Sequence, residues 1–92
     1  MILNISEARE FLRLDGYDND IIIASLLEAI PGYIEVTTGM TKEQQEQEPL
    51  AKTAAKFILQ LWYDPQGQDT EKLKRTIDSL LVALTAIGRT AE

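Results

Sequence analysis

The sequence predicts an all-α protein, a small four-helix bundle with a kinked central helix. Three observations support this fold class. Apolar residues recur at steps of three and four in each long segment, and glycine or proline falls near the ends of those segments. No stretch stands out with the alternating pattern of a half-buried strand. Ninety-two residues correspond to one domain, so residues 1–92 are expected to share a single core.

The central helix is predicted over residues 18–39, the longest segment with a helical repeat. Its apolar stripe consists of Ile23, Leu26, Leu27, Ile30, Tyr33 and Ile34. One of the polar residues 18–20 is expected to cap its start, and Gly39 to end it. Pro31 removes one backbone donor, but the stripe continues through it in phase. We therefore expect one kinked helix in preference to two separate helices.

The N-terminal segment, MILNI, is apolar but too short to form a helix alone. We expect it either to cross the core or to pair with another chain. Ser6 is expected to cap a short helix over residues 7–14, and Gly16 to end it. A helix of this length is unstable in isolation, so packing against the central helix must hold it.

A polar connector follows the central helix, with no apolar residue between Met40 and Leu50. This composition predicts a solvated loop. Thr41 with Gln44 three residues later matches a capping box, which leaves a short exposed helical turn as the alternative.

Two further helices are predicted after the connector. Pro49 suits the first turn of the third helix, and the turn at residues 64–67 ends it. The stripe of this helix consists of Leu50, Ala54, Phe57, Ile58, Leu61 and Trp62. The last helix is expected over residues 70–87, with Gly88 closing it. Its stripe consists of Leu73, Ile77, Leu80, Leu81, Leu84 and Ile87.

The charge of the chain is uneven. Fifteen acids and nine bases give a net charge of −6, with ten acids and three bases in residues 1–48 and five acids and six bases in residues 49–92. Such a molecule could stack on its neighbours with its acidic end against the near-neutral end of the next. The alternative is that the acids simply lie in the first loops and helix caps.

The residue types exclude most small-enzyme chemistry. The chain has no cysteine and no histidine, so it lacks thiolate ligands, disulfides and the commonest general base. We expect no enzymatic activity, no metal and no cofactor. Asp15, Asp18 and Asp20 alternate as calcium ligands do, but no bidentate glutamate follows at the required distance, so caps and turns explain them better.

Nucleic acid and membrane are not expected partners. A net negative charge disfavours attraction to a phosphate backbone, and residues 21–30 offer aliphatics where a DNA-reading helix needs polar side chains. No basic leader precedes a long apolar run, and no segment approaches about 20 apolar residues. A cytosolic protein is expected.

Aromatic residues and one arginine are the candidates for protein interfaces, where large amphipathic rings are enriched. Tyr33 and Trp62 lie on or beside apolar stripes and are expected in the core. Tyr17 and Tyr63 lie at helix ends, which leaves interface contact and local packing equally open. Residues 89–92 carry no signal of order, so a free tail and a docking arm also both stay open.

Several short motifs follow one another along nearly the whole chain. They are Phe11-Leu12-Arg13-Leu14-Asp15, the acids Asp18 and Asp20 leading into Ile21-Ile22-Ile23, Ala29, Tyr33-Ile34-Glu35, Thr38-Gly39, and then Ala54, Ala55, Ile58, Leu61 and Trp62-Tyr63-Asp64. In this order they resemble the head-tail connector family, the adaptor proteins of tailed bacteriophages. Each motif alone is common, and their order makes the resemblance.

The sequence departs from that family in two places. Pro65-Gln66 stands where the family often has an asparagine-arginine pair. Thr85 stands where an arginine is common, which leaves Arg89 one turn later as an interface candidate. Contacts made by those family residues do not transfer directly to this chain.

The resemblance implies a structural protein of a phage or prophage. Copies would form a ring beneath the portal protein at the virion head-tail junction, after assembly in the host bacterial cytoplasm. The ring would join a downstream connector or stopper protein and leave an axial channel for DNA, carried as non-specific cargo. Acids on the channel wall would repel the DNA backbone and let it slide, and Glu43, Glu46 and Glu48 are the candidates.

A second function class stays open from the sequence. The chain could be a small helical binding or regulatory module unrelated to virion assembly. Burial of one apolar patch against a single partner chain would favour that class, whereas portal and tail genes on either side of its gene would favour the adaptor.

Overall fold

The computed structural model describes residues 2–67 and 69–90, which contain five helices and no strand. The helices are α1 (Ile5–Leu12), α2 (Asp20–Thr38), α3 (Lys42–Gln47), α4 (Pro49–Tyr63) and α5 (Thr70–Thr90). The all-α class is confirmed. The expected number of four helices is wrong, because the polar connector forms a helix of its own.

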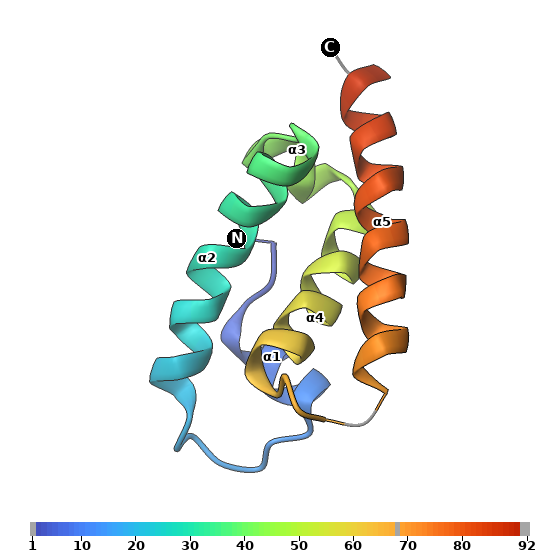
Figure 1. Ribbon diagram of the computed structural model, residues 1–92. Coiled ribbons are helices and arrows are strands. Elements are labelled where there is room, and N and C mark those ends of the chain that lie inside the picture. Colours follow the sequence, from blue (N-terminus) through green and yellow to red (C-terminus); the bar gives the residue numbers. More distant parts are fainter. Residues whose placement is uncertain (1, 68, 91–92) are drawn as a thin grey trace.

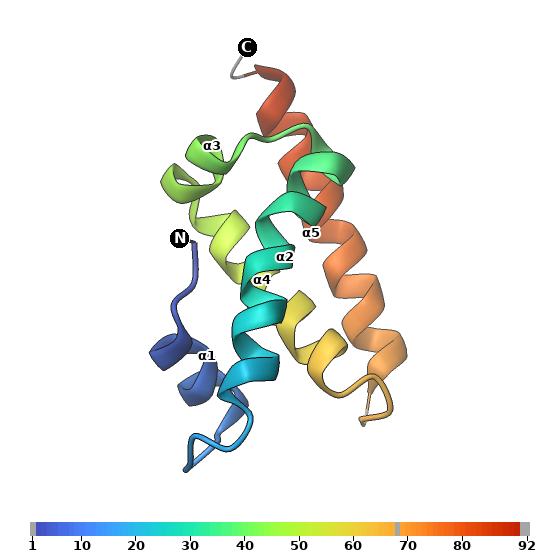
Figure 2. The same cartoon turned by 90° about the vertical axis from the view of Figure 1, so that its left-hand side faces the viewer.

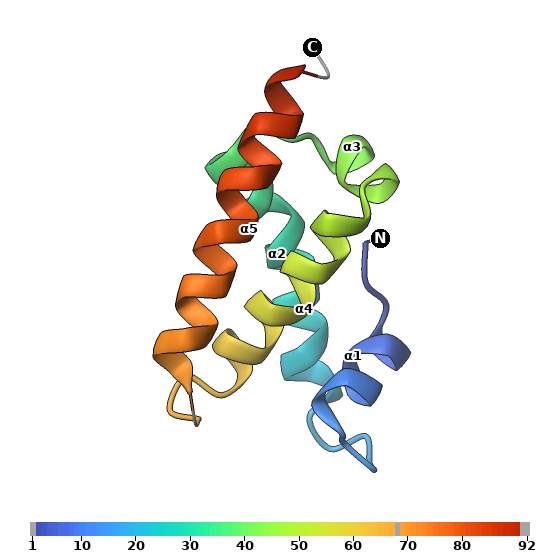
Figure 3. The ribbon, with the colours of Figure 1, turned by 90° about the vertical axis from the view of Figure 1, so that its right-hand side faces the viewer.

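Helix α4 is the central element of the fold and contacts each of the other four helices. Helix α2 covers one side of α4 (Figure 1). In the view of Figure 2, α2 lies in front of α4. Seen from the opposite side, α4 lies in front of α2, with α1 and α5 flanking it (Figure 3). The outward side of α2 and the outward side of α4 therefore face in opposite directions.

Small residues explain why α4 takes this position. Ala51, Ala54 and Ala55 are fully buried, and alanine lets a neighbouring helix approach closely. The buried stripe of α2 consists of Ile23, Leu27, Ile30 and Ile34, and that of α5 of Ile77, Leu81 and Leu84. The stripes predicted for α2 and α5 are thus largely confirmed. In α4 the pattern differs, because Leu59 is buried whereas Leu50 is 37% exposed.

The N-terminal segment crosses the core, as one of the two expectations stated. Ile2 and Leu3 are buried in the main apolar cluster, and Met1 lies outside the described residues. The cap of α1 is Asn4, and the expectation for Ser6 is wrong. Asn4 Oδ1 accepts a hydrogen bond from the Glu7 amide at 2.8 Å, and Glu7 Oε1 accepts one from the Asn4 amide at 3.1 Å. This reciprocal pair satisfies two free amide groups at once, which one serine does not.

Helix α1 also ends earlier than expected. Arg13 adopts the left-handed conformation, with φ of 59°, and its amide bonds back to the carbonyls of Arg9 and Glu10. Gly16 lies beyond this cap, so it does not end the helix. A left-handed non-glycine residue is uncommon, and here the two hydrogen bonds offset its cost.

Helix α3 replaces the expected solvated loop. The Thr41 hydroxyl accepts from the Gln44 amide at 3.2 Å, and the Gln44 side chain accepts from the Thr41 amide at 2.8 Å. The capping-box alternative is therefore confirmed. Six residues do not form a stable helix alone, and the buried side chain of Gln45 attaches α3 to the rest of the protein.

Two predictions about helix continuity had different outcomes. Helix α2 continues through Pro31 and ends at Gly39, whose φ is 81°, while the kink at Pro31 stays a prediction. Helix α5 continues through Gly88 to Thr90, so the expectation that Gly88 closes it is wrong. Gly88 is buried against the end of α2, and this tertiary contact prolongs the helix.

Of the expected C-terminal tail, residues 91–92 lie outside the described residues.

An ion pair connects α1 to α4. Lys52 Nζ contacts Glu7 Oε2, and the same carboxylate accepts from the Asn4 amide. The hydrogen bond from Lys52 holds the pKa of Glu7 below its ordinary value of 4.5, and the Asn4 amide lowers this pKa further. Glu7 therefore favours the folded state most when it is ionised.

We expect Gly88→Ala and Gly39→Ala to change stability in opposite directions. A Cβ added at Gly88 would lie 3.6 Å from the Thr38 carbonyl oxygen, an ordinary contact. Alanine in a helix interior then stabilises by about 0.5–1 kcal/mol. Alanine at Gly39 must adopt a positive φ and costs about 1 kcal/mol or more. Urea unfolding checks both changes, and a lower midpoint for Gly88→Ala would show that the contact with the end of α2 leaves no room for a methyl group.

The contribution of Glu7 to stability should depend on pH. Because its pKa is lower in the folded state, this contribution is present above pH 4.5 and is lost as the pH falls through the lowered value. Glu7→Gln should therefore destabilise the protein at neutral pH and have little effect in acid. Lys52→Gln should show a smaller pH dependence of the same sign, because the Asn4 amide still favours ionised Glu7, and the double variant should lose about as much as Glu7→Gln alone. A pH-independent difference in urea midpoints would contradict this.

Candidate functional site

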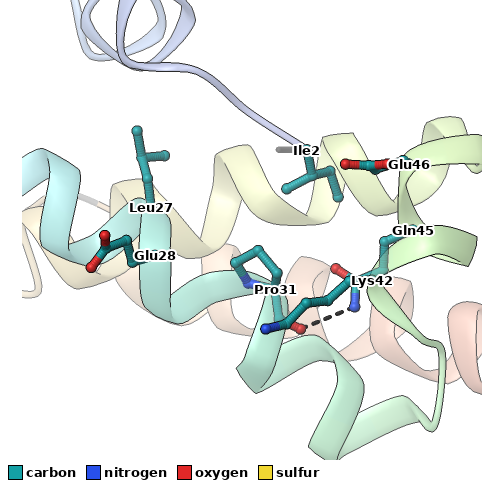
Figure 4. Close-up of a pocket in the computed structure, with 7 residues that line it drawn as sticks. All are labelled: Ile2, Leu27, Glu28, Pro31, Lys42, Gln45 and Glu46. Carbon is teal, nitrogen blue, oxygen red and sulfur yellow. Dashed lines mark hydrogen bonds between the residues drawn. The ribbon is translucent and has the colours of Figure 1, made fainter.

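A small groove lies between the N-terminal segment, α2 and α3 (Figure 4). Its volume is about 280 Å³, close to the lower limit for small-molecule sites. The lining residues are Ile2, Leu27, Glu28, Pro31, Lys42, Gln45 and Glu46. They combine an apolar floor with charged rims and contain no thiol, imidazole or hydroxyl group. This composition suits contact with a side chain better than covalent chemistry.

Gln45 holds this groove in shape. Its Nε2 donates to the carbonyl oxygens of Pro31 and Met40, both at 3.0 Å, and Figure 4 shows the first of these bonds. Carbonyl oxygens only accept hydrogen bonds, so the orientation of the amide is fixed. Gln45 Oε1 is then left buried without a partner. The two donated bonds offset this cost and attach α3 to α2.

The most prominent surface feature is the outward side of α2. We define the α2 outer face as Ile21, Ile22, Ala29, Tyr33 and Val36. Ile21 is 85% exposed, Val36 88%, Ile22 55% and Tyr33 41%. Isolated exposed apolar residues are ordinary, but several on one side of one helix are typical of an interaction site.

The α2 outer face is also free of charge along its length. Glu28 and Glu35 lie on one flank, and the helix carries no base. By length and composition alone, α2 is apolar enough to span a membrane, the one such helix among the described residues. This corrects the expectation that no segment approaches that size. Its inner stripe belongs to the core, so the remaining apolar character lies on the outer face.

Tyr33 shows why the α2 outer face could not be predicted from the sequence. It was expected in the core, but its ring stands at the edge of α2 and meets Trp62 edge-on, with ring centroids 5.2 Å apart. Trp62 is half-buried, as its place beside the α4 stripe suggested. Because α2 is apolar on both sides, spacing of three and four residues does not say which side faces the core.

Two predicted interface residues lie near one end of the bundle. Tyr17 is 73% exposed, and the Arg9 guanidinium stacks 4.6 Å from its ring centroid. Arg9 also donates to Asp20 at 2.7 Å, which fixes the loop before α2. Tyr63 is half-buried, and its hydroxyl accepts from Asn19 Nδ2 at 2.7 Å. For Tyr63 local packing is present, whereas Tyr17 offers an open ring.

The other predicted residues lie toward the opposite end. Arg89 is exposed in the last turn of α5, and Glu43 and Glu46 are exposed on α3. Glu48 is half-buried, and its carboxylate accepts from the Leu50 amide at 3.1 Å, which caps α4. The structure therefore groups the three acids around α3 and keeps them apart from Tyr17 and Tyr63. Their place on a channel wall stays a prediction.

A second hollow surface lies over α4, on the side away from α2. It consists of two adjoining hollows of about 300 and 540 Å³ that share Phe57 and Gln60. We call it the α4 groove and define it by Phe11, Phe57, Gln60, Tyr63 and Leu73. The rings of Phe11 and Phe57 meet edge-on with centroids 6.1 Å apart, and both are half-buried. Helices α1 and α5 form its two walls (Figure 3).

Comparisons with known proteins add no assignment. No protein-family model, curated protein or solved structure matches the chain. Within residues 2–67 and 69–90, no group of three or more acidic side chains is placed to hold a metal ion. The candidate functional features are thus two surfaces, the α2 outer face and the α4 groove.

We expect Gln45→Ala to destabilise the protein by about 2 kcal/mol, because it leaves two carbonyl oxygens without their side-chain donor. Gln47→Ala is the matched control, since Gln47 is exposed on the same helix and should change stability by about 0.5 kcal/mol or less. Urea unfolding measures both. Equal effects would show that the Gln45 bonds do not hold α3.

Proposed function

We propose that the protein is a noncatalytic head-tail connector of a tailed bacteriophage or prophage. In this proposal copies form a ring beneath the portal at the head-tail junction, following assembly in the host cytoplasm, and DNA passes through the ring. The ordered resemblance of the sequence motifs supports the family. The observation that carries the proposal is the apolar α2 outer face, which a protein acting through its surfaces would bury against a neighbour.

The energetics of this surface fit an adaptor that assembles on a template. Complete burial of a large aliphatic side chain contributes about 1.5–3 kcal/mol. A face with a few such residues is smaller than the roughly 800 Å² per partner of a stable interface. Contacts between free copies would then be weak, and the portal would gather copies into a ring by adding a second contact to each one.

The charge distribution has a place in the same proposal. Glu43 and Glu46 on α3 supply exposed acids for a channel wall, which would repel the DNA backbone and prevent it from sticking. Tyr17 and Arg89, near opposite ends of the bundle, would contact the portal and the downstream connector or stopper protein. A bend of α2 at Pro31 would curve the outer face along the ring.

The alternative is a small helical binding module unrelated to virions. The α2 outer face also suits this function, because one partner helix could cover it completely. The two proposals differ in stoichiometry. A binding module forms a one-to-one complex, whereas a connector adds many copies to one portal.

Electron microscopy of portal rings mixed with the purified protein tests the connector function. We expect an added ring of density on the tail-facing side of the portal from the same phage or prophage. Portal rings from an unrelated phage are the control and should stay bare. Bare cognate portals at high protein concentration would count against the connector, and a one-to-one complex with a single helical protein would support the alternative.

A further inference from the structure

The two candidate surfaces of this protein, the α2 outer face and the α4 groove, differ in shape and lie on opposite sides. The α2 outer face is the convex side of a single helix, and no other helix of residues 2–67 and 69–90 covers it (Figure 2). The α4 groove is hollow, and the half-buried rings of Phe11 and Phe57 line it. A convex apolar helix face and a hollow lined by aromatic rings, with polar and charged residues around them, are complementary in shape.

The charges of the two helices are also complementary. Helix α2 carries Asp20, Glu28 and Glu35 and no base, whereas α4 carries Lys52 and Lys56 and no acid. Asp20 and Lys52 already have partners, Arg9 and Glu7. Glu28 and Glu35 on α2 are left for contacts between molecules, while Lys56 on α4 keeps its charge at the edge of the groove, where it also acts on Glu7.

The surroundings of the α4 groove do not oppose an acidic helix. Its rim holds two bases, Arg13 and Lys72, and two acids, Asp64 and Asp69, whose charges cancel. Lys56 lies beside it, 5.9 Å from the centroid of the Phe11 ring, in a hollow that Glu7 and Glu10 share.

Two copies of α2 placed face to face would behave differently. Such a pair would bring Glu28 and Glu35 of both copies together, four acids with no base on either α2, and like charges at a contact destabilise it. Charge therefore disfavours a two-fold pair through α2 and favours contact between the α2 outer face and a different, less acidic surface.

We propose that copies of this chain associate head to tail, with the α2 outer face of one copy seated in the α4 groove of the next. This inference identifies the surfaces by which neighbouring subunits of the proposed ring contact each other. It rests on the proposed function only for the closure of the row of copies into a ring. Because the two surfaces differ, the contact is heterologous, and repetition gives a ring or a filament according to the rotation between neighbours. The centre of the α2 outer face, Ala29, then lies near the centre of the groove, Gln60.

Single cysteines test this contact directly, because the chain has no cysteine of its own. Ala29→Cys and Gln60→Cys change exposed residues at the two centres, so the result does not depend on which way α2 runs in the groove. The variants are mixed at about 1 mM, where even a contact with a Kd near 1 mM is substantially populated, and treated with a short bismaleimide.

We expect a linked dimer containing one copy of each variant, and a ladder of larger species from the protein that carries both cysteines. Each single variant alone should stay unlinked, and so should Ala29→Cys mixed with Asp78→Cys, which lies on exposed α5 away from the groove. Linking of Ala29→Cys to itself would show a two-fold pair and overturn the proposal. Absence of the mixed dimer would overturn it as well.

Two exposed valines supply a matched pair of blocking variants. Val36 on the α2 outer face is 88% exposed and Val82 on α5 is 71% exposed, so aspartate at either position leaves the core intact. Val36→Asp in the Ala29→Cys chain should lower the yield of mixed dimer about tenfold or more, because a charge is then buried at the contact. Val82→Asp should leave the yield unchanged. Equal yields would contradict the assignment of the surface.

These outcomes separate the contact from the function. If the mixed dimer forms but the portal rings stay bare, the head-to-tail contact is supported and the connector function is not. If the portals carry a ring but no mixed dimer forms, the connector function is supported and the contact between subunits involves other surfaces. Far-ultraviolet circular dichroism of each variant confirms that the helices are intact before linking.

Discussion

The packing of α2 against the alanine side of α4 is the contact on which the rest of the structure depends. Ala51, Ala54 and Ala55 have no exposed surface, and their small side chains let the stripes of α2 and α5 reach a common core. A chain of 92 residues has room for only one such core. Helices α1 and α3 are too short to be stable alone, so they hold their shape because this core anchors them.

One-sided burial has a consequence for the surface. Helix α2 is apolar on two sides, but α4 and α5 cover only one of them. The other side stays exposed to water. Its apolar side chains contribute no burial free energy to folding, and their contact with water is unfavourable. Covering it releases free energy of the same kind, though less of it than the inner stripe provides, and in the proposed connector this supplies the contact between copies.

The sequence could be interpreted most reliably where local chemistry decides the structure. Gly39 ends α2 and Pro49 begins α4 as expected, because a left-handed glycine and a proline at the first turn need no distant partner. The cap of α1 was misplaced, since Asn4 and Ser6 are both good caps and only the bond with Glu7 distinguishes them. The end of α5 was misplaced because the contact of Gly88 with the end of α2 is not visible in local spacing.

For the candidate site, the interface role of the aromatic residues Tyr17 and Tyr63 stays a prediction. Tyr33 was expected in the core but is exposed, and the exposed Val36 was not predicted. Periodicity measures how apolar residues are spaced around a helix, and it does not say which neighbour lies on each side. The buried Gln45 was missed for a related reason. A glutamine in a polar connector is ordinarily solvated, and it becomes structural only when the carbonyls of Pro31 and Met40 come within reach.

By itself, the sequence determined the helical class, the approximate extent of the long helices, the uneven charge and the lack of cysteine and histidine. These follow from residue identity and near-neighbour spacing. Only the tertiary structure decided that α4 is central, that α3 forms, and that a convex apolar helix and a hollow groove lie on opposite sides of the molecule. These depend on which side of each helix finds a partner, and that choice belongs to the packing of the whole chain.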